Sequence, residues 1–171
     1  MSLPSAVSLQ SLPDNQLEHV LSLLFEPSPV LSRLVIPAIH STPIASYSQL
    51  SSLVNQSLSS LPTSSPDLLS ILSAHPRLGA KKVDSAQSQK EQSSLGSDAE
   101  RQQLQALNEE YEARYPGLRY VVFVNGRSRE EVMKDMRYRI ENGSFDGECK
   151  AAIQAMCDIA LDRARKLGIK E

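Results

Sequence analysis

The sequence predicts an all-α, single-domain bundle of about seven to nine helices. Apolar residues recur at the spacing of a helix face along most of the chain, and serine-led helix start signals separate these stretches. Only one short segment has the composition of a β-strand. The 171 residues are enough for a sizeable core, so we expect one domain over residues 1–171 with its core at about 11–167.

Four helices are predicted before residue 75. The first is expected to begin after Ser11 as N-cap, and the second and fourth begin at Ser28-Pro29 and Ser65-Pro66, where proline takes the first helical position. Their apolar positions are, in chain order, Leu17, Val20, Leu21 and Leu24; Val30, Leu31, Leu34 and Val35; Leu50, Leu53, Val54, Leu58 and Leu61; and Leu68, Leu69, Ile71 and Leu72.

Three more helices are predicted after residue 96. Capping boxes at residues 97–100 and 128–131 open the first two, and Asn142-Gly143 ends the second. The last is expected over residues 148–167, before Gly168. The apolar positions of the first and last are Leu104, Leu107, Tyr111 and Tyr115; and Cys149, Ala152, Ile153, Met156, Cys157, Ala160, Ala164 and Leu167.

Residues 120–124 are the exception to the helical pattern. Their sequence, Tyr-Val-Val-Phe-Val, is typical of a strand, and Asn125-Gly126 is typical of a hairpin turn. A capping box follows at once, so no partner strand is present, and a lone strand cannot satisfy its backbone groups. We therefore predict a buried connector near residues 119–125, either extended or a short helical turn, which could present backbone groups to a ligand.

Composition and charge exclude several classes of protein. Apolar residues make up 40% of the chain and charged residues 22%, and the net charge of −2 gives no footprint for nucleic acid or an anionic membrane. The basic run at residues 163–170 is expected to be a solvated face. No apolar run has the length of a membrane span, and neither a signal peptide nor a C-terminal peroxisomal signal is present, so we expect a cytoplasmic protein.

His75 is the first candidate for chemistry. It precedes Pro76, which pushes its backbone out of the helical region and ends the fourth helix there. Because the carbonyl end of a helix favours a cation, this imidazole is held rigidly where it can exchange a proton. The alternative is that His75 only caps the helix, and for a histidine considered alone we favour that alternative.

A polar helix at residues 85–95 is the second candidate. Ser88, Glu91 and Gln92 are three and four residues apart, so they share one face, and that face has no large apolar residue. They would offer a hydroxyl, a carboxylate and an amide to a ligand. A solvent-facing helix with ordinary surface charges is an equal alternative when this segment is considered alone.

Arg139 is the third candidate, because it projects from the apolar stripe that contains Val132 and Met136. A guanidinium on a buried face needs an anionic partner. That partner is either a protein carboxylate such as Glu148 or a substrate carboxylate held by two hydrogen bonds. The chain has no metal-ligand spacing, phosphate-binding glycine loop or Schiff-base lysine, so we expect no metal and no cofactor.

Five short motifs in order resemble the OHCU decarboxylase family, whose enzymes act on 2-oxo-4-hydroxy-4-carboxy-5-ureidoimidazoline (OHCU) late in urate breakdown. They are His-Pro-Arg-Leu-Gly at 75–79, Ser-Gln-Lys-Glu-Gln at 88–92, Leu-Asn-Glu-Glu-Tyr-Glu-Ala-Arg-Tyr at 107–115, Val-Phe-Val-Asn-Gly-Arg-Ser at 122–128 and Arg-Ile-Glu-Asn at 139–142. Many relatives have aspartate where this chain has Arg77, which we expect to alter the rim of the site. The family's Phe-Gly-Phe-Pro-Phe is replaced at residues 115–120.

The resemblance implies an all-helical, cofactor-independent enzyme, typically a homodimer, that converts this small anionic substrate to (S)-allantoin. It implies that His75 is the catalytic acid or base and that Glu91 is also catalytic. The substrate contacts that it implies are Pro76, Ser88, Gln92, the backbone of Tyr120, Val121, Val122, Phe123 and Val124, and Arg139 as a carboxylate clamp. Two alternatives stay open: a non-catalytic helical scaffold or ligand-binding protein derived from that family, and hydrolysis of an amide or ureide by a His/Glu pair.

Overall fold

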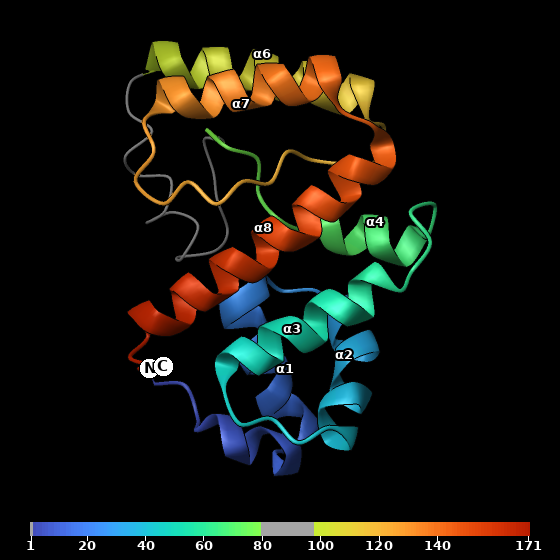
Figure 1. The fold of residues 1–171 in the computed structure, drawn as a ribbon, viewed down its shortest axis with the longest axis vertical. Helices are drawn as coiled ribbons and strands as arrows, with labels where there is room; N and C mark the ends of the chain where they lie inside the picture. The colour runs from blue at the N-terminus through green and yellow to red at the C-terminus, as the bar shows by residue number, and fades with distance from the viewer. Residues whose placement is uncertain (1, 80–97) are drawn as a thin grey trace.

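The computed structural model describes residues 2–79 and 98–171, and it confirms the all-α prediction for them. One 3₁₀-helix and seven α-helices make up this part of the chain, with no strand (Figure 1). In order they are η1 (Ala6–Ser11), α1 (Asp14–Phe25), α2 (Pro29–Ser41), α3 (Tyr47–Ser59), α4 (Pro66–Ser73), α6 (Asp98–Arg114), α7 (Arg129–Asn142) and α8 (Phe145–Lys166).

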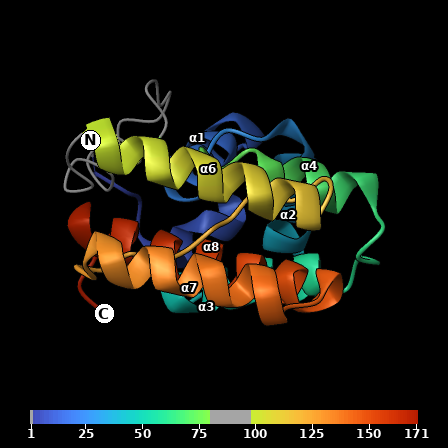
Figure 2. The same cartoon turned by 90° about the horizontal axis from the view of Figure 1, so that it is seen from above.

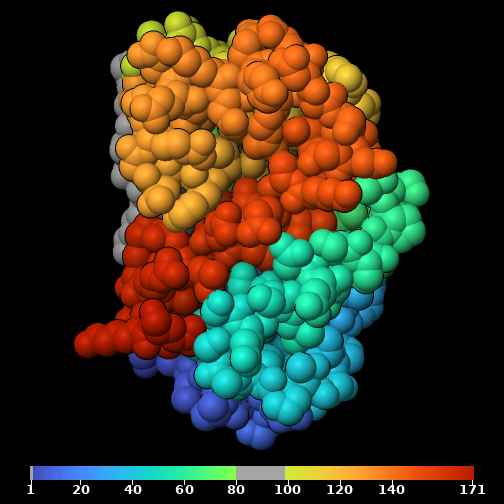
Figure 3. Space-filling view, in the orientation of Figure 1, coloured from blue at the N-terminus to red at the C-terminus, as the bar shows by residue number. Residues whose placement is uncertain are grey.

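Helix α8 crosses the middle of the molecule and connects its two ends. On one side it packs against α1 and α3, and on the other side lie α6 and α7, which pack side by side (Figures 1 and 2). The space-filling view shows α8 crossing the visible face between α7 and α3 (Figure 3). Helices α6 and α7 run in the same direction (Figure 2), so the chain between them must return along the length of α6.

That return segment is the connector predicted near residues 119–125. Residues 118–124 have no regular secondary structure, which excludes the short helical turn. Tyr120 and Val121 are buried and residues 122–124 are half-buried, as expected for a connector beneath two helices. An extended chain advances farther per residue than an α-helix does. A short extended segment can therefore return along the length of α6, a helix of 17 residues.

The predicted apolar faces form the core, and each serine-proline start is confirmed. The side chains of Ser28 and Ser65 accept hydrogen bonds from the backbone N–H groups of Leu31 and Leu68. The side chain of Ser128 does the same at the start of α7, whereas the cap expected at Ser97 lies outside the described residues. Most of the predicted apolar positions are buried; Val30, Leu34, Leu53, Leu61, Leu69 and Leu167 are half-buried against the core.

Three local predictions were wrong. Ser11 belongs to η1, and α1 begins at Asp14 because Leu12, which precedes Pro13, is held in an extended conformation that cannot start a helix. Helix α8 begins three residues earlier than expected, at Phe145, where the Ser144 side chain caps it.

The third concerns the basic run at residues 163–170, in which Arg163 is not solvated. Its guanidinium is 1% exposed and donates to Glu26 at 2.8 Å and to the carbonyl of Leu24 at 3.2 Å, which fixes α8 to the end of α1. Within the described residues no single helix is long and apolar enough to cross a membrane; only the α1–α2 pair, bent by 118°, meets that test of length and composition.

Candidate active site

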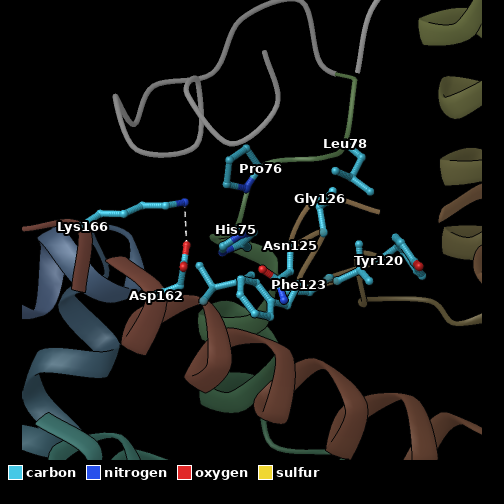
Figure 4. Close-up of a pocket in the computed structure, with 13 residues that line it drawn as sticks. His75, Pro76, Leu78, Tyr120, Phe123, Asn125, Gly126, Asp162 and Lys166 are labelled. Carbon is cyan, nitrogen blue, oxygen red and sulfur yellow. Dashed lines mark ion pairs between the residues drawn. The ribbon is translucent and has the colours of Figure 1, made fainter. Parts of the chain in front are cut away.

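A cavity of about 250 Å³ lies where three separate parts of the chain meet. They are the loop after α4, the connector and the C-terminal half of α8 (Figure 4). Its lining residues are His75, Pro76, Leu78, Tyr120, Val121, Val122, Phe123, Val124, Asn125, Gly126, Ile159, Asp162 and Lys166. The fold therefore gathers His75, Pro76 and all of residues 120–124, which are far apart in the sequence, around one space.

His75 lies two residues beyond the end of α4 and is 8% exposed. Figure 4 shows its ring among the residues that line the cavity. The backbone carbonyl of His75 accepts a hydrogen bond from the Arg119 guanidinium at 3.3 Å, which joins this loop to the start of the connector. Burial lowers the pKa of Arg119, and the nearby Arg77 charge lowers it further. The imidazole is thus placed by a helix end, a proline and a connector contact.

Helix α6 fixes the rest of the loop. The Asn108 side chain donates to the carbonyl of Leu78 at 2.9 Å, in a buried position. Gly79 has φ +73°, and a Cβ there would lie 3.3 Å from Leu104, so both the conformation and the space favour glycine. Asn108 and Leu104 are one helical turn apart on α6, and together they fix how closely the loop after α4 packs against that helix.

Arg77 contacts α6 rather than the cavity. Its guanidinium makes a bidentate pair with Glu112 at 2.7–3.1 Å, and the hydrogen bonds that it donates to that carboxylate raise the pKa of Arg77. Arg77 is absent from the cavity lining, so the expected change to the rim of the site is not seen among the described residues. Arg77 thus adds a tether between the loop and α6.

The outer side of the connector is held by α7. The Tyr120 hydroxyl donates to the Asp135 carboxylate, and Arg139 donates to the carbonyl of Val121 at 3.3 Å. The Arg139 guanidinium also lies over the Tyr120 ring, 4.6 Å from its centroid. Burial raises the pKa of Tyr120, and its hydrogen bond to Asp135 raises it further, so this phenol stays protonated. Residues 120 and 121 therefore have one side against this network and another against the cavity.

Glu148 is the partner of Arg139, as one of the two alternatives predicted. The Arg139 Nε donates to Glu148 at 2.7 Å, and the side chains are 13% and 6% exposed. Tyr111 donates to the same carboxylate oxygen at 2.7 Å. Burial alone would lower the pKa of Arg139, but the charge of Glu148, the nearby Tyr120 and Tyr111 and the hydrogen bond to Glu148 together outweigh it, and the pKa is raised. Arg139 is not among the residues that line the cavity, so the geometry does not bring it together with His75 as a clamp.

The corner between α7 and α8 belongs to the same network. The Tyr115 hydroxyl donates to the Arg139 carbonyl at 2.6 Å, and a Cβ at Gly143 would lie 2.5 Å from that hydroxyl. The corner thus requires glycine for space rather than for backbone conformation. The predicted residues Ser88, Glu91 and Gln92 lie outside the described residues.

Sequence reasoning missed six lining residues: Leu78, Asn125, Gly126, Ile159, Asp162 and Lys166. Asn125 and Gly126, with φ of +45° and +75°, form the turn at the end of the connector, which the sequence signalled only as a hairpin turn. Ile159, Asp162 and Lys166 share one face of α8 at a spacing of three and seven residues. That spacing was readable, but an acidic and a basic residue four apart look like an ordinary surface pair.

Comparisons with known proteins agree with this architecture. The sequence model of the OHCU decarboxylase family matches residues 10–165. A crystal structure of (S)-allantoin synthase superposes with a TM-score of 0.66 at 19% identity, over 96% of this chain and 54% of that one. The chain thus spans about half the length of that structure, and at this identity the likeness concerns the fold. No curated protein matches this chain.

Proposed function

Because the chain belongs to the OHCU decarboxylase family, we propose that it converts OHCU to (S)-allantoin. The observation that carries this proposal is the single cavity shared by His75, Pro76 and residues 120–124. An imidazole, a stiff neighbouring ring and a stretch of backbone free of helix and strand together suit a small polar substrate. The cavity volume of about 250 Å³ suits a small ligand rather than a polymer.

The substrate itself accounts for the electron pair that decarboxylation leaves. Its carboxylated carbon adjoins a C=N bond; when the bond to CO₂ breaks, the electron pair moves toward that nitrogen. That nitrogen takes up a proton; the resulting enol then loses its hydroxyl proton and gains a proton at carbon, which gives allantoin with a net uptake of one proton. The protein must therefore orient the carboxylate, remove one proton and deliver another to a single face.

In this proposal His75 is the group that delivers the proton to one face of the intermediate. It is nearly buried and is held at the cavity by Pro76 and by the contacts of its loop, so its reach is restricted to one side of a bound molecule. A proton delivered from one side makes one enantiomer, which is how the chain would yield the S product. Glu91 acts beside it on the hydroxyl or a ring N–H, with Ser88 and Gln92 as further contacts.

Residues 120–124 supply backbone contacts to the ureido and ring amides. These residues belong to no helix or strand, so their N–H groups are not committed to secondary structure. Three of their carbonyls have protein donors: Arg139 donates to Val121, and Arg127 donates to Phe123 and Val124. The substrate's own carbonyl groups would therefore meet mainly N–H donors from this wall.

The direct test is the lifetime of OHCU. OHCU is generated in solution from urate by enzymatic oxidation and ring hydrolysis, and its ultraviolet absorbance is followed with and without the protein. We expect the absorbance to decay faster in proportion to protein concentration. Decay at the spontaneous rate at every concentration would refute the decarboxylase and leave the two alternatives, a non-catalytic scaffold or ligand-binding protein and hydrolysis of an amide or ureide.

The chain is also proposed to act as a homodimer, with α7 at the contact. Tyr138 on α7 is 66% exposed, beside a groove of about 580 Å³ between α6 and α7. Lys134 and Glu141 lie on the same groove, so an antiparallel pair of α7 helices would set each lysine opposite the partner's glutamate.

This contact predicts a dissociating substitution. By light scattering, we expect the wild type to have twice the mass of one chain and Tyr138→Glu to have the mass of one. Asn142→Glu, an equally acidic change at an exposed position of α7 outside that groove, should stay dimeric. A monomeric wild type, or a dimer that survives Tyr138→Glu, contradicts the proposed contact.

A further inference from the structure

The charges at the cavity are unevenly distributed. Among the described residues that line it, Lys166 is the only lysine or arginine and Asp162 the only carboxylate. The remaining lining is apolar side chains, Tyr120, the turn at Asn125 and Gly126, backbone and His75. A ligand with a negative charge would therefore find one permanent cation in this part of the wall.

Lys166 and Asp162 form an ion pair at the mouth of the cavity. The Lys166 Nζ lies 2.6 Å from an oxygen of Asp162, one turn earlier on α8, and the side chains are 64% and 21% exposed. Figure 4 shows the lysine stem reaching toward Asp162 beside the other lining residues. The pair thus lies partly in water and partly on the cavity wall.

The ion pair between Lys166 and Asp162 is weak, so the lysine is available to bind an anionic ligand. An exposed ion pair four residues apart contributes little, because water screens it and both side chains lose freedom. A lysine ammonium has three donors, so it can donate to a second anion, with which Asp162 then competes for the same positive charge. Being mostly exposed, it also needs no new burial to do so. Arg139, by contrast, already donates to Glu148 and Val121 behind the wall.

We propose that Lys166 is an anion-binding residue of this cavity, which receives the carboxylate of a small ligand, and that Asp162 competes for it. This inference rests on the proposed function for the identity of the natural ligand. Lys166 would hold the carboxylate of that ligand at the mouth of the cavity. It assigns the carboxylate contact to a residue of the basic run 163–170, which the sequence pattern placed on a solvated face. Asp162 then sets how strongly the anion is held.

The test compares two cyclic ureides that differ in charge. Hydantoin-5-acetate carries a carboxylate and hydantoin does not, and calorimetry gives a Kd for each whether or not the protein turns over a substrate. We expect the wild type to favour the anion and Lys166→Met to weaken anion binding about three- to fivefold at low salt, the range of a partly exposed ion pair. Hydantoin binding should stay unchanged, and Lys166→Arg should retain the preference.

Substitution of Asp162 should act in the opposite direction. Asp162→Asn removes the competing carboxylate, so the anion should bind more tightly than in the wild type. Arg165→Ala removes one positive charge from the same turn of α8 at an exposed position outside the cavity lining, and it should leave the ratio of the two Kd values close to the wild-type ratio.

Three results would overturn the inference: a wild type without preference for the anion, a Lys166→Met variant that keeps the preference, or weaker anion binding in Asp162→Asn. These outcomes are separable from failure of the proposed function. A protein that decarboxylates OHCU but keeps its preference in Lys166→Met refutes only the role of Lys166. A protein without turnover whose preference depends on Lys166 refutes only the decarboxylase.

Discussion

Replacing His75 with asparagine should lower kcat/KM for OHCU by about 10²- to 10⁴-fold, the usual contribution of a positioned acid or base. Asparagine keeps a polar side chain of similar size but cannot exchange a proton near neutral pH. The His75 side chain is 8% exposed just beyond α4, and asparagine keeps much of its volume, so the substitution removes the proton-exchanging group and little of the packing. Initial rates of OHCU decay, corrected for the spontaneous rate, measure the loss.

The control for this substitution is His19→Asn. His19 is exposed on α1 and does not line the cavity, so its replacement should leave the rate at the wild-type value. Thermal unfolding of both variants shows whether the fold is kept. Full activity in His75→Asn, with the fold intact, would show that the imidazole only caps α4, and the assignment of the acid or base would be wrong even though the family is established.

Replacing Arg139 with methionine should lower the free energy of unfolding by about 3–5 kcal/mol, as when one partner of a buried ion pair is removed. Glu148, 6% exposed, would keep a buried charge without its cation, and the carbonyl of Val121 would lose its donor. The connector would also lose the guanidinium that lies over Tyr120. Equilibrium unfolding in urea measures the change.

Two variants separate this account from a substrate clamp. Arg137 lies on α7 like Arg139, and it forms an exposed ion pair with Glu110 of α6. Arg137→Met should therefore lower the free energy of unfolding far less than Arg139→Met. The double variant Arg139→Met/Glu148→Met should recover most of the stability, since it leaves no unpaired charge. If Arg139→Met is as stable as the wild type and only raises KM, Arg139 binds the substrate carboxylate and its structural role is refuted.

The helices could be predicted from the sequence because their signals are local. Start residues such as Ser28 and Ser128 act on N–H groups three residues away, and the apolar faces repeat within one turn. The predicted start of α1 was wrong for an equally local reason. Pro13 holds Leu12 in an extended conformation, and this effect outweighs the preference of Ser11 for an N-cap position. The connector was predictable from the lack of a partner strand.

The site was less predictable because its contacts are not local. An arginine on an apolar stripe demands an anion, but the sequence cannot choose between Glu148, nine residues away, and a ligand. Asp162 and Lys166 look like any surface pair until the connector is placed beside α8. One cavity is lined by both His75 and residues 120–124 because the chain returns beneath α6 and α7. Only the family resemblance indicated this in advance.

The most direct measurement of the central claim is the circular dichroism of the product. OHCU generated from urate decays without catalysis to racemic allantoin, which gives no signal. We predict that the wild-type protein produces a signal of the sign of (S)-allantoin, at a rate proportional to its concentration, and that His75→Asn does not. Allantoin that stays optically inactive at every protein concentration would contradict the claim that this chain decarboxylates OHCU from one face.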